Sequence, residues 1–315
     1  MRALPASAHA PISNRGQSVP PKRFMSREPN FGQGARHPAH PDGFEAIDGF
    51  RIKPPATRKK PRVRSIRELT YGSRRFKLQT GKASNSQTQI GDTSLYPWRV
   101  NCLLKITVPG KTEAFLGTGW FIGPYAVITA AHAVYPREPG IYVGWASQIE
   151  VITGANGSGK PVHDPITSSL FYCPDGWQSD GDLRLDYGAI ILNQGIGSEV
   201  GFYGYATYSD SDLLSSVANL SGYPEFKPDQ TPADGTQWYA AGNVVSVDES
   251  FVYYYLDAES GESGSCVYRN IGDQSYAMAI HVASQGSDSS MALDRGLRIT
   301  EPVSENLQHW SSLTG

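Results

Sequence analysis

Short apolar stretches interrupted by glycine and proline constrain the fold of this 315-residue chain more than any other feature. The stretches are rich in β-branched and aromatic residues and recur at short intervals, as expected of β-strands joined by turns. One helix pattern stands out near the C-terminal end, from Pro302 to His309, where Val303, Leu307 and Trp310 share a face. We therefore expect an all-β fold with a C-terminal helix. The expected strands cover residues 101–108, 119–122, 126–129, 148–152, 189–192, 218–221, 237–247, 251–256, 265–268 and 276–282.

Three residues in this β-rich region have settings that favour nucleophilic catalysis. His132 ends the sequence Thr-Ala-Ala-His, Asp186 precedes an apolar run, and Ser263 lies in Gly-Glu-Ser-Gly-Ser. A serine hydroxyl is a weak nucleophile until a base takes its proton, and the base in turn needs an orienting acid. The three side chains can supply these roles if folding brings them together.

The glycines around Ser263 predict a sharp turn, because glycine adopts backbone angles that larger residues avoid. Such a turn can aim the N–H groups of Gly261 and Ser263 at one point, which is the geometry of an oxyanion hole. The alternative is a Gly/Ser-rich hairpin loop, which is common in β-proteins. The sequence is not a Gly-x-Ser-x-Gly elbow, since residue 265 is serine and a strand pattern follows.

His132 and Asp186 also have simpler interpretations. A histidine beside an apolar segment is more often a core or surface residue, and an aspartate at a strand edge often caps a turn. The strand–turn–strand pattern before His132 favours the catalytic interpretation, as does the cost of placing the Asp186 carboxylate at a buried strand without a partner. Asp164, Asp175, Asp180 and Asp182 lie in polar loops and are weaker candidates for the acid.

From about Ile90 to Trp310 the chain resembles the V8-like glutamyl endopeptidase branch of the chymotrypsin-fold serine proteases. Matching stretches in the same order include residues 96–99, 117–124, 201–205, 221–224, 235–238, 279–281 and 295–300, besides the three motifs above. The resemblance implies two six-stranded antiparallel β-barrels, with His132, Asp186 and Ser263 in the cleft between them. It also implies a serine endopeptidase that acts on protein or peptide substrates outside the cell.

The resemblance further assigns His281 to the primary specificity pocket, where its imidazole would bind the carboxylate of a substrate Glu or Asp. Without the resemblance, His281 would be taken as a core histidine of its strand. Two neighbours of the serine motif depart from the family pattern. Ala258 stands where a threonine is usual, and Glu259 follows it, so strict selectivity for Glu is not implied.

The sequence divides near residue 86. Residues 1–86 are rich in Arg, Lys, Pro and Gly, and we expect a disordered tail or pro-segment there. The protease domain is expected to cover 87–315. Arginines at 64, 67, 74 and 75 offer sites for an activating protease of trypsin-like specificity. The basic run at 58–64 is typical of a solvated tail, so we expect no nucleic-acid partner.

Composition and short sequence motifs bear on the remaining questions of membrane insertion, export, metal binding and disulfide formation. The formal net charge is −2, and no stretch of eighteen apolar residues favours a membrane span. No secretory signal is visible after Met1, although the resemblance implies export. No Cys/His spacing indicates zinc, so we expect neither a metal nor a cofactor. Cys102, Cys173 and Cys266 cannot all pair within one chain.

Two rival functions remain open. The first is a catalytically silent protease-fold domain that binds extended peptides along a sheet edge. The second is an esterase on the same scaffold, which differs only in its acyl substrate.

Overall fold

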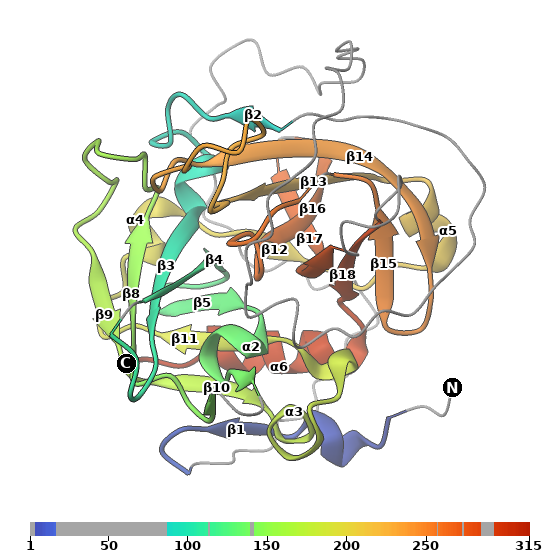
Figure 1. Cartoon of the computed structure of the whole chain (residues 1–315). Helices are drawn as coiled ribbons and strands as arrows, with labels where there is room; N and C mark the ends of the chain where they lie inside the picture. Colours follow the sequence, from blue (N-terminus) through green and yellow to red (C-terminus); the bar gives the residue numbers. More distant parts are fainter. Residues whose placement is uncertain are drawn as a thin grey trace.

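The structure is a computed structural model that describes residues 4–16, 87–112, 114–138, 142–256, 258–272, 274–284 and 293–315. Two large sheets make up the body, one on each side of the centre of the molecule (Figure 1). Short helices lie in the connections, and one longer helix ends the chain. The mostly β architecture and the C-terminal helix confirm the fold expected from the sequence.

The second sheet is a closed barrel. Six of its strands pair in a ring, because β17 bonds both to β16 and to β18. The register shifts between His281 and Ala283 and between Val267 and Tyr268, and such bulges let strands bend enough to close a barrel. The ring consists of β13 (Val217–Gly222), β14 (Trp238–Val247), β15 (Phe251–Tyr254), β18 (Asp294–Arg298), β17 (Gln274–Ser284) and β16 (Cys266–Ile271). The short strands β12 (Gly204–Tyr205) and β2 (Thr88–Gln89) add to its edges.

The first sheet is curved but not closed by a continuous ladder, so the two expected six-stranded barrels take the form of one closed barrel and one half-barrel. Its strands follow the order β1-β10-β11-β5-β4-β3-β8-β9. Side-chain and loop hydrogen bonds bridge the gap between β9 and β11, from Ser168 Oγ to Ile191 O (2.6 Å) and from Ile191 N to Leu170 O (3.0 Å). The strands are β1 (Pro11–Ser13), β3 (Asn101–Thr107), β4 (Phe115–Phe121), β5 (Ala126–Thr129), β8 (Gln148–Thr153), β9 (Ile166–Ser168), β10 (Phe171–Pro174) and β11 (Gly188–Ile191).

The connections hold the remaining short elements. They are η1 (Ala6–His9), η2 (Trp98–Val100), α2 (Ala131–Val134), α3 (Asp175–Asp180), η3 (Leu183–Leu185), α4 (Gly197–Val200) and α5 (Asp210–Leu214), together with a separate pair of strands, β6 (Arg137–Glu138) and β7 (Tyr142–Val143). None of the helices in the described ranges is long and apolar enough to cross a membrane.

One cluster of buried apolar residues contains side chains from both sheets, and a second lies within the closed barrel. The rings of Trp120 and Tyr203 meet edge to face at 5.7 Å, and Tyr203 stacks on Tyr268 at 5.1 Å. These contacts join β4 of the first sheet to β16 of the second, and all three side chains are buried. Since packed aromatic rings of this size leave little freedom, the core fixes how the two sheets face each other.

The C-terminal helix α6 (Glu301–Ser311) packs on the first sheet. Its buried face carries Val303, Leu307 and Trp310, as the sequence predicted, and the Trp310 ring lies 5.6 Å from that of Tyr187. Asn306, also buried, donates from Nδ2 to the Tyr187 hydroxyl (2.7 Å). The helix therefore supports the segment immediately after Asp186.

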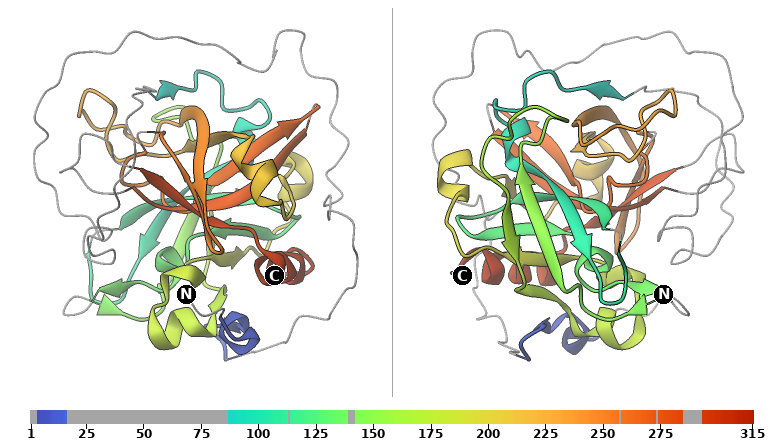
Figure 2. Two further views of the ribbon diagram at one scale, coloured as in Figure 1. Left: turned by 90° about the vertical axis from the view of Figure 1, so that its right-hand side faces the viewer. Right: turned by 60° about the vertical axis from the view of Figure 1, so that its left-hand side comes forward.

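Residues 4–16, although part of the expected tail, are folded against the body. Strand β1 pairs antiparallel with β10 at the edge of the first sheet, and η1 contacts α3 near the bottom of both views in Figure 2. His9 ties this segment to the same network: its carbonyl accepts from Asn306 Nδ2 (2.8 Å), and its Nδ1 lies 3.0 Å from the Tyr187 hydroxyl. The remaining residues of the expected tail, 1–3 and 17–86, lie outside the described part of the chain.

Replacing Ala8 with Glu should loosen the N-terminal segment. Ala8 packs against the core beside Gly176, where a carboxylate would be partly removed from water. We expect the free energy of unfolding of the full chain to fall by about 1–3 kcal/mol, measured by guanidinium denaturation. The matched control is Ser7→Glu, at an exposed neighbour in the same turn. Equal effects of the two substitutions would contradict the packing described here.

Candidate active site

His132 lies in the one-turn helix α2, directly after β5. Ala130 is extended and Ala131 begins the helix, and both are fully buried. The helix packs on Gly188, where an added Cβ would come within 2.8 Å of Val134 Cγ2. Small residues at 131 and 188 thus let α2 approach the start of β11, two residues beyond Asp186.

Asp186 holds both the backbone and the ring of His132. Its Oδ1 accepts from the His132 N–H (2.9 Å), and its Oδ2 lies 2.8 Å from His132 Nδ1. Asp186 is completely buried, whereas 9% of the His132 surface is exposed. A proton on Nδ1 satisfies this carboxylate and leaves the Nε2 lone pair to act as a base. The structure thus brings together two of the residues predicted from the sequence.

The serine loop connects the two sheets. Thr118 N of β4 donates to Ser263 O (3.0 Å), and Thr118 Oγ1 donates to Gly261 O (2.9 Å). At Gly264 the φ angle is +91°, and a Cβ there would collide with Thr118 O and Thr129 Oγ1 and lie 2.9 Å from Ala130 N. Only glycine fits this position, both in conformation and in space. The close approach seats Ser263 against the strand end that leads into His132.

Two backbone N–H groups in this loop lack acceptors among the described residues. The amides of Glu262, Gly264 and Ser265 donate to Glu259 O, His281 O and Glu262 O, whereas those of Gly261 and Ser263 donate no hydrogen bond within the part of the chain that the structure describes. Gly261 and Ser263 are both buried. Buried amides are almost always paired, so two open donors two residues apart point to a site for an anionic or carbonyl oxygen.

His281 lies behind the serine loop on β17. It is completely buried, its backbone bonds to Gly264 and Ser265, and its Nδ1 lies 2.9 Å from the hydroxyl of Tyr254 on β15. Ala258, on the other side of the loop, is fixed through its N–H, which donates to Asp294 Oδ2 (3.3 Å). The structure therefore places His281 next to the loop that carries Ser263.

Glu262, immediately before Ser263, is a feature that the sequence analysis missed. Its carboxyl group is fully buried, and burial raises its pKa to about 8. Oε2 accepts from Gln87 Nε2 (2.6 Å) and from Glu259 N (2.7 Å), while Oε1 has no partner within the described residues. At neutral pH the group is mainly uncharged, so it adds no negative charge beside the open amides. No signal in the sequence distinguishes a buried acid from an exposed one in this loop.

No group of three His, Cys, Asp or Glu side chains within the described ranges is arranged to hold a metal ion. The three cysteines are buried, and none of them forms a disulfide. Burial raises the pKa of the Cys266 thiol, which follows the serine loop.

Comparison with curated proteins identifies the family to which the chain belongs. The chain is 33% identical over 230 residues to the extracellular metalloprotease of Bacillus subtilis, covering 73% of this chain and 69% of the relative. It is 31% identical over 242 residues to the glutamyl endopeptidase of Bacillus licheniformis, covering 75% and 71%. The chain belongs to the glutamyl endopeptidase family. The resemblance inferred from its motifs is therefore confirmed, and the protein is a serine-type endopeptidase related to extracellular proteases.

Solved structures support the fold assigned to this chain. A Glu endopeptidase in complex with MPD superposes with a TM-score of 0.60 at 24% identity, covering 73% of this chain and 98% of that one. The protease Anisep from Arthrobacter nicotinovorans gives a TM-score of 0.56 at 17% identity, with coverages of 72% and 99%. No protein-family model matches the chain.

The Glu262→Gln variant should resist alkaline pH better than the wild type. Because the pKa of this acid is higher in the folded than in the unfolded chain, the folded state binds the extra proton, and stability falls as pH rises from about 4.5 toward 8. Glutamine keeps an oxygen for the two N–H donors but has no proton to lose. We expect the difference in Tm between the variant and the wild type to increase, in favour of the variant, by roughly a few °C from pH 6 to pH 9.

The check is a series of thermal melts across that pH range. The conservative control is Glu259→Gln, at a partly exposed neighbour in the same loop. A difference between Glu262→Gln and wild type that stays constant with pH would show that the carboxyl does not titrate in this window.

Proposed function

We propose that this serine endopeptidase hydrolyses peptide bonds through His132, Asp186 and Ser263, and that it prefers Glu or Asp before the cut. The observation that carries the proposal is the buried Asp186–His132 pair beside a serine loop with two open amides. Ser263 Oγ attacks the carbonyl carbon while His132 Nε2 takes its proton. Asp186 keeps the ring oriented and stabilises the imidazolium.

The later steps follow from the same groups. The N–H groups of Gly261 and Ser263 bind the oxyanion of the tetrahedral intermediate. His132 then gives its proton to the leaving amine, and an acyl-enzyme remains on Ser263. A water molecule, deprotonated by His132, attacks that ester. The bond between the acyl carbon and Ser263 Oγ then breaks, His132 returns the proton to Ser263 Oγ, and the second product leaves the free enzyme.

The preference for an acidic residue rests on His281. When the Tyr254 hydroxyl donates to Nδ1, the proton of the neutral ring sits on Nε2, from which it can donate to a substrate carboxylate. The name of the Bacillus licheniformis relative supports this assignment. The nearby Glu262 does not oppose an acidic substrate while its high pKa keeps it neutral. We further propose that the enzyme acts outside the cell and that another protease cuts within residues 1–86 to activate it.

Ser263→Ala should abolish peptide cleavage while leaving the fold intact. Without the hydroxyl there is no nucleophile, and we expect kcat/KM to fall by at least about 10⁴-fold. The measurements are turnover of a quenched fluorescent peptide and covalent labelling by a fluorophosphonate. The matched control is Ser260→Ala, three residues earlier in the loop. A wild type that neither cleaves peptides nor reacts with the label would favour the silent peptide-binding domain, and turnover of esters alone would favour the esterase.

Tyr254→Phe should weaken the choice of Glu over Gln before the cut. Without the hydroxyl, nothing from Tyr254 keeps the proton of the His281 ring on Nε2. The charge-assisted hydrogen bond from Nε2 to the substrate carboxylate therefore weakens. We expect the kcat/KM ratio for matched Glu and Gln peptides to fall by about tenfold, with little change for the Gln peptide. Tyr253→Phe is the control, because that hydroxyl bonds to Asp248 instead (2.8 Å). A peptide library cut mainly after Lys or Arg would overturn the assignment of His281.

A further inference from the structure

The turn that presents Asp186 is tight, and both of its neighbours are buried. Tyr187 N donates to Leu185 O (2.8 Å). Asp186, between them, has φ −78° and ψ 65°, which are the angles of an inverse γ-turn. Leu185 and Tyr187 are both completely buried. The direction of the Asp186 carboxylate therefore depends on where the side chains of these two neighbours are fixed.

The N-terminal segment contacts the first neighbour through Ala8. An added Cβ at Gly176 of α3 would lie 2.5 Å from Leu185 Cδ1 and 3.2 Å from Ala8 Cβ, so the three residues meet at this point. The helix η1, which includes Ala8, contacts both α3 and α6. One side of the Asp186 turn is thus packed against the N-terminal segment.

The same segment contacts the second neighbour through His9, which is held at two atoms. Asn306 Nδ2 of α6 donates both to the His9 carbonyl (2.8 Å) and to the Tyr187 hydroxyl (2.7 Å). The hydroxyl in turn lies 3.0 Å from His9 Nδ1. The start of the chain, the segment after Asp186 and the C-terminal helix therefore share one hydrogen-bonded group.

The Tyr187 hydroxyl uses His9 as its acceptor. Burial lowers the pKa of His9, and Asp182 and Arg184 act on that pKa with opposite signs. Burial also raises the pKa of Tyr187, so both groups are uncharged near neutral pH. Because the hydroxyl accepts from Asn306, its own proton is donated to His9 Nδ1. A buried hydroxyl that loses its acceptor is destabilised and has to shift to find another.

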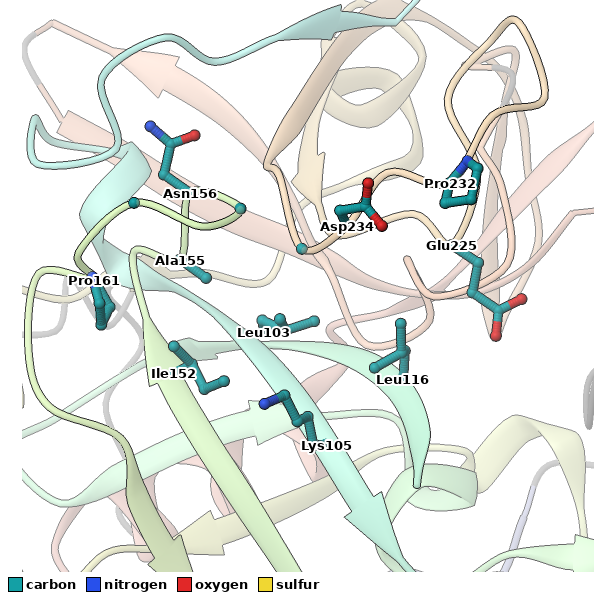
Figure 3. Close-up of a pocket in the computed structure, with 13 residues that line it drawn as sticks. Leu103, Lys105, Leu116, Ile152, Ala155, Asn156, Pro161, Glu225, Pro232 and Asp234 are labelled. Carbon is teal, nitrogen blue, oxygen red and sulfur yellow. The ribbon is translucent and has the colours of Figure 1, made fainter. Parts of the chain in front are cut away.

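The His9 contact lies apart from the surface hollow shown in Figure 3. Leu103, Leu116 and Asp234 are among the residues that line this hollow, and neither His9 nor Tyr187 is one of its described lining residues. Tyr187 is instead joined directly to Asp186, whose two carboxylate oxygens hold His132. An influence of His9 on turnover therefore passes through Asp186.

We propose that His9 is a positioning residue for Asp186. By accepting from the Tyr187 hydroxyl, His9 fixes one side of the γ-turn and so keeps both carboxylate oxygens on His132. The inference rests on the proposed function, because it assumes that Asp186 orients His132 during the reaction. The N-terminal segment thus contributes one side chain to the arrangement of the catalytic residues.

The first test is His9→Leu in the full chain, which keeps a side chain of similar volume but offers no acceptor. We expect kcat to fall by about 3–10-fold with little change in KM, because His132 is held less firmly while the substrate contacts stay the same. His9→Asn can place an acceptor oxygen near the position of Nδ1 and should restore most of the lost kcat. A fall in kcat that asparagine does not reverse would contradict the role of the acceptor.

Two further measurements separate positioning from a merely structural role. The proton NMR signal of His132 Nδ1–H, bonded to Asp186, should shift or broaden in His9→Leu and return in His9→Asn. Tyr187→Phe keeps the ring and should lower kcat as much as His9→Leu does. The two substitutions together should cause no further loss, since they remove the same hydrogen bond. An unmoved NMR signal, or losses that multiply, would overturn the inference.

Asn14→Ala is the matched control at the other end of the segment. Asn14 Nδ2 donates to Ser169 O (2.7 Å), and Phe171 N donates to Asn14 Oδ1 (3.1 Å). Removing these bonds should lower the Tm of the full chain and leave kcat within about twofold of wild type, because they do not involve Tyr187. A loss of kcat equal to that of His9→Leu would show that docking of the segment in general, and not the His9 acceptor, is what matters.

The outcomes also distinguish this inference from the proposed function. Wild-type kcat in His9→Leu would overturn the positioning role, while a large loss of kcat in Asp186→Asn and covalent labelling of Ser263 would leave the proposed function intact. Wild-type kcat in Asp186→Asn would overturn the proposed role of Asp186 and the inference with it.

Discussion

The contact between the serine loop and the end of β5 is the constraint on which the site depends. Gly264 fills a space bounded by Thr118, Thr129 and Ala130, where any side chain would collide with its surroundings. Ser263 comes from the closed barrel and His132 from the segment after β5 of the open sheet, so no single sheet contains the proposed catalytic residues. The aromatic contacts through Tyr203 hold the sheets together from within, and the glycine allows their loops to meet at the surface.

Glu262, next to the proposed nucleophile Ser263, shows how burial changes the chemistry of a residue. In water, Glu262 would carry a negative charge beside the two open amides that are proposed to bind an oxyanion. Removal from solvent keeps it protonated near neutral pH, and hydrogen bonds from Gln87 and Glu259 hold its position. The bond from Gln87 ties the residue before β2 to the serine loop.

Much of this arrangement is predictable from the sequence, because it depends on local patterns. Strand periodicity located β3, β5, β14 and β17, and the amphipathic spacing of Val303, Leu307 and Trp310 located α6. Glycine at 264 predicted a turn, but its need for space depends on residues more than 130 positions away. Strand β1 has only three residues and is stabilised by pairing with β10, so it carries no pattern of its own. The burial of Glu262 also depends on distant segments such as Gln87, which local patterns do not reveal.

Strand β1 has a consequence for the make-up of the working enzyme. The ladder with β10 and the bonds from Asn306 and Tyr187 to His9 hold residues 4–16 without help from the covalent chain that follows them. A cut between residues 17 and 86 would break the polypeptide but none of these bonds. The product would then be a non-covalent heterodimer, one particle when folded and two peptides of unequal mass once denatured.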